Sequence, residues 1–340
     1  MEHFCDVSCW DALLNFRSRT TQRGGRPIYT PFEQLLGITL NSEDWQAPER
    51  IAAHTDFPEA CAIMAARLLG LYDESIRLRW LIEFSRYTTF SLIVCLLAGE
   101  REDDPDSWVT IGKLQRVLPS LGIPGGRNIT ELVSKMQNDG LLRSVRAPHD
   151  GRVRLLRPTQ QMIALDRQFM PVTHAPLHRL FPEEGYDAAL RGDAVYHHAF
   201  RRASLQSLGV VQRVMSANPG ADFFIQKTVG TRVLMLLYME TAEAADGATQ
   251  PGFLTRAAER SMVSRTHVSN LISAAAEAGF VQTSGSRKDT VIMSPALRQD
   301  TEMWIADSLS ATSITHRLAL EIAAAEGPAL AMPPWDGCSE

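Results

Sequence analysis

The clearest hydrophobic pattern in the chain lies between residues 109 and 159. Within it, the apolar residues of the stretch 127–139 recur at intervals of three and four: Ile129, Leu132, Val133 and Met136. This spacing puts the apolar side chains on one face of an α-helix, and Gly140 is suited to end that helix. The pattern therefore predicts an amphipathic helix whose other face is polar and accessible.

The segments on either side of this helix complete a local arrangement. Residues 109–120 predict a shorter helix, and a Gly/Pro-rich turn at 121–126 joins it to the amphipathic helix. Two short alternating runs follow, 142–146 and 152–156, and the turn 148–151 joins them as a two-stranded hairpin. Two helices joined by a turn and followed by a basic hairpin form the plan of a winged helix, a DNA-binding fold.

The hairpin and its exit resemble those of MarR-type transcriptional regulators. In that family the hairpin carries Asp-x-Arg, then a strand, then Leu-Thr before the next helix. This chain has Asp150 and Arg152 in the first two places, but Arg157-Pro158-Thr159 stands where the family has Leu-Thr. The resemblance implies a winged helix that binds double-stranded DNA. It also implies that Asp150 orients the arginine of the hairpin through a charge pair.

The chain then repeats this arrangement at an offset of 139 residues. Residues 265–281 align with 126–142 without a gap, and a helix at 253–262 precedes them. We expect the second hairpin to be about two residues shorter than the first, with Pro158 and Pro295 at equivalent exits. A repeat of this length predicts two structural units of the same kind in one chain.

These patterns divide the chain into five segments. They are an N-terminal extension (1–57), a first winged-helix domain (58–170), a connector (171–186), a second winged-helix domain (187–326) and a flexible tail (327–340). The connector is placed where three prolines follow one another closely. We expect a mainly α fold with two winged helix-turn-helix units, each with a short β-hairpin, on a helical, dimer-like body with pseudo-two-fold symmetry. Such a chain would act as a monomeric pseudo-dimer or as a homodimer.

Charge is distributed unevenly along the chain. The formal net charge is −5, so the whole chain is not basic. Residues 107–157, however, hold nine Lys and Arg against three Asp and Glu, and residues 253–288 hold five against two. Basic units in an otherwise acidic chain favour local contact with phosphates.

The candidate DNA-contacting residues lie on the polar faces of the two amphipathic helices and on the two hairpins. In the first unit they are Arg127, Asn128, Thr130, Glu131, Ser134, Arg146, Asp150, Arg152 and Arg154. In the second they are Thr266, His267, Ser269, Asn270, Ser273, Arg287 and Lys288. Helix residues can reach base edges in the major groove, whereas hairpin cations suit phosphates or the minor groove. Because the units differ, we expect an asymmetric site with half-sites about one helical turn, roughly 10 bp, apart.

Other chemistry is not indicated by the sequence. The five cysteines are scattered, and no zinc spacing, phosphate-binding glycine loop or nucleophile motif is present, so no enzyme, metal or cofactor is expected. His197 and His198 are expected as a surface pair. No apolar run approaches the ~20 residues of a membrane helix. The odd number of cysteines without a signal peptide favours the cytoplasm.

The sequence thus predicts a sequence-specific transcriptional regulator that binds double-stranded DNA through two recognition helices in one chain. Two alternatives stay open: a replication initiator with tandem winged helices, and winged helices that dock other proteins. The MarR resemblance further implies a small-molecule effector in a pocket between the body and the DNA-binding units, although no residue names its ligand.

Overall fold

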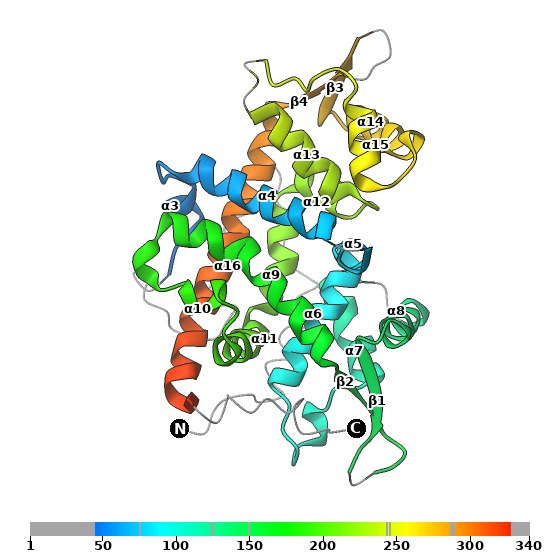
Figure 1. The fold of residues 1–340 in the computed structure, drawn as a ribbon, viewed down its shortest axis with the longest axis vertical. Coiled ribbons are helices and arrows are strands. Elements are labelled where there is room, and N and C mark those ends of the chain that lie inside the picture. The colour runs from blue at the N-terminus through cyan, green and yellow to red at the C-terminus, as the bar shows by residue number, and fades with distance from the viewer. Residues whose placement is uncertain are drawn as a thin grey trace, which may run out of the picture.

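The computed structural model describes residues 45–74, 76–123, 126–148, 150–242, 244, 246–285 and 290–327. Over these residues the chain is mainly α-helical, with two small antiparallel sheets of two strands each (Figure 1). The mainly α class expected from the sequence is confirmed. Most of the expected N-terminal extension and nearly all of the expected tail lie outside the described residues.

The helices before the first sheet are α3 (Pro48–Ala52), α4 (Phe57–Glu74), α5 (Ile76–Leu81), α6 (Phe84–Ala98), α7 (Ile111–Val117) and α8 (Arg127–Asn138), with the 3-10 turns η1 (Pro105–Ser107) and η2 (Leu118–Leu121). The first sheet pairs β1 (Leu142–Arg146) with β2 (Arg154–Pro158). After it come α9 (Gln160–Leu180), η3 (Pro182–Glu184), α10 (Asp187–Leu190), α11 (Ala194–Ala217), α12 (Pro219–Ile225) and α13 (Gly230–Ala242). The last part contains α14 (Phe253–Ser261), α15 (Arg265–Glu277), β3 (Val281–Ser284), β4 (Thr290–Met293) and α16 (Pro295–Glu326).

Two parts of the chain have the same order of elements. We name α6 to β2 the first unit and α13 to β4 the second unit. The first unit lies at the lower right of Figure 1 and the second at the top, and α16 runs from the second unit down through the molecule. In the first unit the predicted apolar face of α8 is buried at Ile129, Val133 and Met136, whereas Leu132 is only half-buried. Ile129, Val133 and Met136 therefore form the buried face of α8.

The backbone hydrogen bonds of the second unit repeat those of the first at the predicted offset of 139. The N–H of Leu141 donates to the carbonyl of Met136, and the N–H of Phe280 donates to that of Ala275. A short extended stretch before each helix pair also contacts the hairpin: Leu156 bonds to Val109 in the first unit, and Ala248 bridges to β4 in the second. The alignment made from the sequence therefore corresponds to matching local structure.

The exits of the two hairpins differ from the expectation. Pro158 pairs with Leu142, and its counterpart Met293 pairs with Val281, so Pro295 is not the equivalent of Pro158. Pro158 lies sixteen residues after its partner and Met293 only twelve, so the second hairpin is four residues shorter, where about two were expected. Pro295 is instead the first residue of α16, where a proline loses no hydrogen bond.

The expected connector at 171–186 is largely helical. Helix α9 continues to Leu180 with Pro171 and Pro176 inside it. Each proline removes one helical hydrogen bond. The neighbouring Val172 and Leu177 are buried, and this burial supports a helix that the local propensity disfavours. The prolines were therefore misleading as markers of a linker.

The helices outside the two units pack together, and we call them the body. Helix α4 lies along α9, α11 lies along α16, and α16 also contacts α3 and α9. Phe200 and Ala203 of α11 meet Ile314 and Leu318 of α16 in an apolar contact. Since α9 leaves the first unit and α16 leaves the second, the body joins the exits of both.

Buried polar residues connect α9 to α11. Asp166 of α9 is fully buried, and both of its oxygens accept hydrogen bonds from Arg201 at 2.6 and 2.7 Å. The ring of His197 lies 2.6 Å from the same carboxylate. His197 and His198 are therefore not the surface pair expected from the sequence. His198 is also buried, within hydrogen-bond distance of the carbonyl of Ala98.

A second buried chain of polar groups joins α9, α11 and α16. The hydroxyl of Tyr196 lies 2.9 Å from the ring of His174 and 2.7 Å from that of His316. Burial lowers the pKa of His174 to about 3, and it also lowers the pKa of His316. Both imidazoles are therefore neutral in the folded protein at pH 7.

We expect the folded chain to lose stability as the pH falls below about 6.5. The unfolded chain binds protons on these histidines near their ordinary pKa, whereas the folded chain does not, so protons favour unfolding until the folded pKa of His174 is reached. Replacing His174 by Gln should reduce the slope of unfolding free energy by about 1.4 kcal/mol per pH unit between pH 6 and 4. Urea unfolding at several pH values measures this slope, and equal slopes for both proteins would contradict the prediction.

Candidate nucleic-acid interface

The residues predicted to contact DNA are mostly exposed. Twelve of them are open to solvent: Arg127, Asn128, Thr130, Glu131, Ser134, Arg146, Asp150, Arg152, Arg154, Thr266, Asn270 and Ser273. His267 and Ser269 are half-buried. Arg287 and Lys288, at the tip of the second hairpin, lie outside the described residues. The amphipathic patterns thus placed the polar faces of α8 and α15 correctly with respect to solvent.

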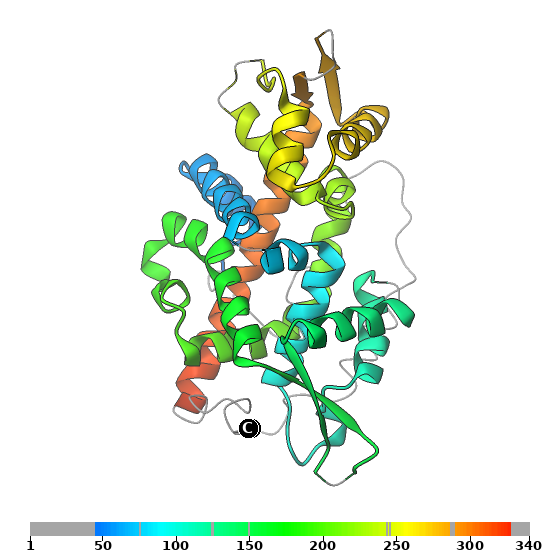
Figure 2. The same cartoon turned by 45° about the vertical axis from the view of Figure 1, so that its right-hand side comes forward.

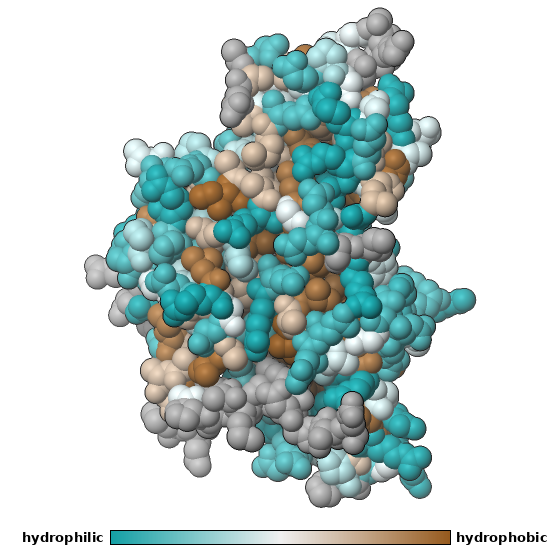
Figure 3. All heavy atoms as spheres, viewed as in Figure 1, coloured by the Kyte–Doolittle hydropathy of each residue, from teal (hydrophilic) through white to brown (hydrophobic). Residues whose placement is uncertain are grey.

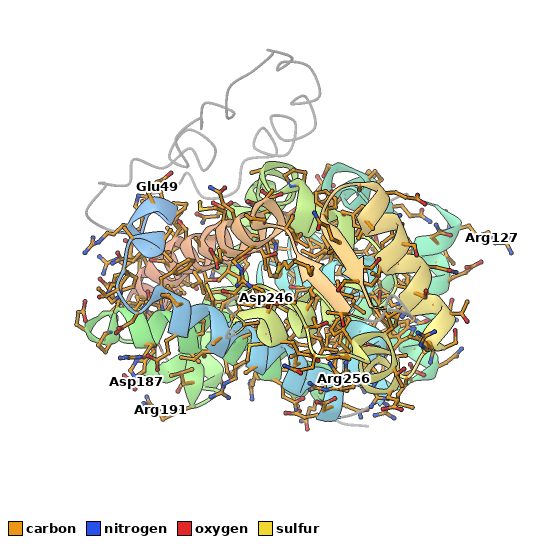
Figure 4. All side chains as sticks on the ribbon, turned by 90° about the horizontal axis from the view of Figure 1, so that it is seen from above. Glu49, Arg127, Asp187, Arg191, Asp246 and Arg256 are labelled. Carbon is orange, nitrogen blue, oxygen red and sulfur yellow. The ribbon has the colours of Figure 1, made fainter. Side chains whose placement is uncertain are left out.

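The start of α8 projects from the first unit. Arg127 is its first residue, and the guanidinium is paired with Glu131 at 2.8 Å, with side chains 91% and 61% exposed. An ion pair this exposed contributes little and gives way readily to a stronger anion. Figure 4 shows Arg127 pointing away from the molecule at one edge, with Arg191 on the opposite side. The amino end of α8 is therefore accessible to a large partner.

Two pairs of arginines lie opposite each other on the two strands of the first hairpin. The register sets Arg146 opposite Arg154 and Arg143 opposite Arg157. Arg157 is half-buried and neutralised by Glu100, but the other three are exposed. Like charges directly opposite each other in a sheet are destabilising. The pair Arg146–Arg154 therefore costs stability in the free protein, and a bound polyanion would remove this cost.

The loop between β1 and β2 departs from the expected geometry. Strand β2 begins at Arg154, two residues later than predicted, so Arg152 lies in the loop. The carboxylate of Asp150 accepts the backbone N–H of Arg152 at 2.9 Å. It thus fixes the turn through the backbone rather than through the guanidinium pair that the family resemblance implied, and the side chain of Arg152 extends into solvent.

In the second unit, α14 and α15 are joined by a turn of three residues. Met262 adopts a left-handed conformation with φ 54°, as Gly122 does in the first unit with φ 81°. Ser264 then caps α15 by accepting the backbone N–H of His267. The imidazole of His267 lies 3.2 Å from the carbonyl of Thr228, so this side chain secures α15 to the turn before α13. The sequence predicts this side chain as a DNA contact, and the structure places it half-buried in this hydrogen-bond position.

A groove runs along α15 on the second unit. A polar row at four-residue spacing borders it: Arg265, Ser269, Ser273 and Glu277. Apolar and small residues complete it: Leu254, Ile272, Ala276 and Thr283. Its volume is about 370 Å³. This groove was not predicted, although the four-residue spacing of the polar row is visible in the sequence.

The two units differ in the charge that they present. In the first, several exposed arginines make no ion pair with another described residue: Arg116, Arg143, Arg146, Arg152 and Arg154. In the second, Glu240 pairs with Arg256 and Asp73 pairs with Arg260. Within residues 253–285 this leaves Arg265 as the basic residue without an ion pair among described groups. Among the described residues, the first unit thus presents the more strongly cationic surface.

Helices α8 and α15 lie on the same side of the molecule. They stay on one side in two views turned by 45° about the vertical axis (Figures 1 and 2). The surface over α8 and the first hairpin is mostly hydrophilic (Figure 3). One extended partner could therefore approach both helices from a single direction.

Neither a metal centre nor a membrane helix is present in the described part of the chain. No three His, Cys, Asp or Glu side chains there gather closely enough to hold a metal ion. No described helix combines the length and apolar character that crossing a bilayer requires. Comparisons with models of protein families, with curated proteins and with solved structures gave no match.

We expect Arg154→Thr to stabilise the free protein by about 0.2–1 kcal/mol, because it removes the repulsion with Arg146 across the hairpin. Thermal unfolding at low salt measures the gain, which should shrink as salt screens the charges. Arg143→Thr is the matched control, since its opposite residue Arg157 is already neutralised by Glu100. An equal gain from both variants would show that repulsion is not the cause.

Proposed function

We propose that this chain is a sequence-specific transcriptional regulator that binds double-stranded DNA through two winged helix-turn-helix units. The observation that carries the proposal is the exposed pair Arg146–Arg154, in which two cations face each other across the first hairpin. Such an arrangement is unfavourable unless a polyanion shares it. In this proposal the hairpin contacts the phosphates beside the groove that α8 enters.

The accessible amino ends of the two helices support reading of base edges. Arg127 and Asn128 stand at the start of α8, and Thr266 and Asn270 occupy the exposed face of α15. Arg can bind guanine with two hydrogen bonds, and Asn can bind adenine in the same way. Because the described part of the second unit presents fewer unpaired cations, we assign phosphate attraction chiefly to the first unit and additional discrimination to the second.

A cytoplasmic location belongs to the same proposal. Cys61 and Cys95 are buried and unpaired, as is common in a reducing compartment.

The competing function is protein binding by the second unit. The groove along α15 favours it, and the 66% exposed Met262 lies in the turn that leads to the same helix.

Salt dependence tests DNA binding most directly. A bound sequence is first selected from random duplexes, and its affinity is then measured over a range of salt concentrations. Replacing both Arg146 and Arg154 by Ala should weaken binding to all sequences and reduce the slope of log affinity against log salt by about 2. Arg191→Ala, on the opposite side of the molecule, is the matched control and should leave the slope unchanged.

Sequence discrimination is tested on the helix. Arg127→Ala should lose about 1–3 kcal/mol of preference for the selected sequence over one changed at a single base pair. Its affinity for unrelated duplexes should change much less, because phosphate contacts are retained. If the intact chain selects no sequence and its affinity for DNA is insensitive to salt, the proposed function is wrong and protein binding becomes the better explanation.

A further inference from the structure

The stretch from the end of α4 to the start of α6 touches both units. We call residues 73–83 the bridging segment; α5 lies within it, and Ser75 lies outside the described residues. On its path from the body to the first unit it passes next to the second unit. If both units bind one duplex, their spacing must match the helical repeat of DNA. The contacts of this segment, together with the packing of α13 on α4, hold that spacing.

Two carboxylates at the ends of the bridging segment hold the second unit. Asp73 pairs with Arg232 of α13 through one oxygen and with Arg260 of α14 through the other, at 3.2 Å. Glu83 accepts the backbone N–H of Val229, just before α13, at 2.9 Å. The two carboxylates thus reach three separate points of the second unit.

The middle of the bridging segment contacts α8 and the turn that leads to α15. The guanidinium of Arg79 hydrogen-bonds to the sulfur of Met262, in the turn that leads to α15. The ammonium of Lys135, a residue of α8, lies 5.4 Å from the centre of the ring of Trp80. Arg86 of α6 lies over the same ring at 5.1 Å. This short segment therefore contacts the helix-turn-helix of each unit.

Burial makes the contact of Asp73 difficult to replace. The side chain of Arg232 is 1% exposed, and its Nε and Nη1 have no partner among the described groups. Its guanidinium lies 4.8 Å from the ring of Tyr72, and Asp73 is the acid that pairs with it. An unpaired buried cation is strongly destabilising. Moving α13 away from the end of α4 would therefore separate the guanidinium of Arg232 from its counter-charge, Asp73.

The residue that Glu83 contacts, Val229, has a strained backbone conformation. Val229 has φ 54°, which a β-branched residue rarely adopts. The carboxylate of Glu83 holds this residue by its N–H, and the preceding carbonyl, of Thr228, is the one that His267 of α15 contacts. A continuous set of contacts thus leads from the start of α6 to α15.

We propose that the bridging segment fixes the separation and relative orientation of α8 and α15, with Asp73 and Glu83 as positioning residues for DNA binding. The part that concerns DNA rests on the proposed function, whereas the fixed separation does not. The segment acts on both units through the contacts described, so loosening its ends should let the second unit shift against α4 while the first keeps its own core.

The separation can be measured without DNA. Spin labels are attached to Asn128→Cys and Asn270→Cys in the full chain, with Cys5, Cys9 and Cys338 changed to Ser and the buried Cys61 and Cys95 retained. We expect a narrow distance distribution for the parent and one roughly twofold wider for the double variant Asp73→Asn, Glu83→Gln, as for tethered rather than fixed modules. An unchanged width in the double variant would overturn the proposal.

Two further variants separate positioning from general damage. Glu240→Gln removes an ion pair to α14 that lies within the second unit, so it should leave the distribution narrow. If the double variant does not fold, Arg260→Gln removes only the outer contact of Asp73 and should broaden the distribution by a smaller amount. Equal broadening by Glu240→Gln would assign the effect to the second unit itself and refute the bridging role.

DNA phasing tests the consequence for binding. Inserting about 5 bp between the half-sites should weaken binding by the parent roughly tenfold, because the second half-site then faces away. For the double variant we expect a loss of less than about threefold. A parent that binds no DNA would overturn the proposed function alone, since the label distances still report on the bridging segment. A phasing penalty that is unchanged in the double variant would overturn its positioning role.

Discussion

One buried carboxylate, Asp166, joins the helix that leaves the first unit to the central helix of the body. Burial by itself would raise the pKa of Asp166, but Arg201 and His197 outweigh burial and hold the pKa below its ordinary value. Separating α9 from α11 would leave Arg201 buried without a counter-charge, which is strongly unfavourable. Because α11 also packs along α16, this ion pair ties the exit helices of both units into one body.

Local structure was largely predictable from the sequence. The periodicity of α8 was correct because Ile129, Val133 and Met136 belong to a pattern that a single helix can satisfy alone. The repeat was recognisable because the turn at Gly140 recurs at Gly279, both with positive φ, where glycine is favoured. Tertiary burial was not predictable: Pro171 and Pro176 lie within a helix whose support comes from distant neighbours.

The exposure of the candidate interface residues was predictable from the sequence. Their contacts with residues distant in the chain were less predictable. Residues on the polar face of an amphipathic helix are exposed wherever the other face is buried, so Arg127 and Asn270 were placed correctly. Pairing across space left no such local pattern. His267 contacts Thr228, 39 residues earlier in the chain, and Arg157 meets Glu100, 57 residues earlier. His197 was misjudged for the same reason, because its partner Asp166 lies on another helix.

The length of α16 gives the fold a mechanical property. It spans 32 residues, which corresponds to about 48 Å of helix. It starts directly after β4, just past its middle Ser313 accepts a hydrogen bond from the backbone of Gln46 beside α3, and at its far end Ile322 and Ala323 pack against the apolar contact with α11. A tilt of about 5° at that end would carry the first turn, and the hairpin attached to it, through about 4 Å. Helix α16 is therefore a lever arm, by which a small displacement in the body becomes a movement of the second hairpin comparable to the length of a side chain.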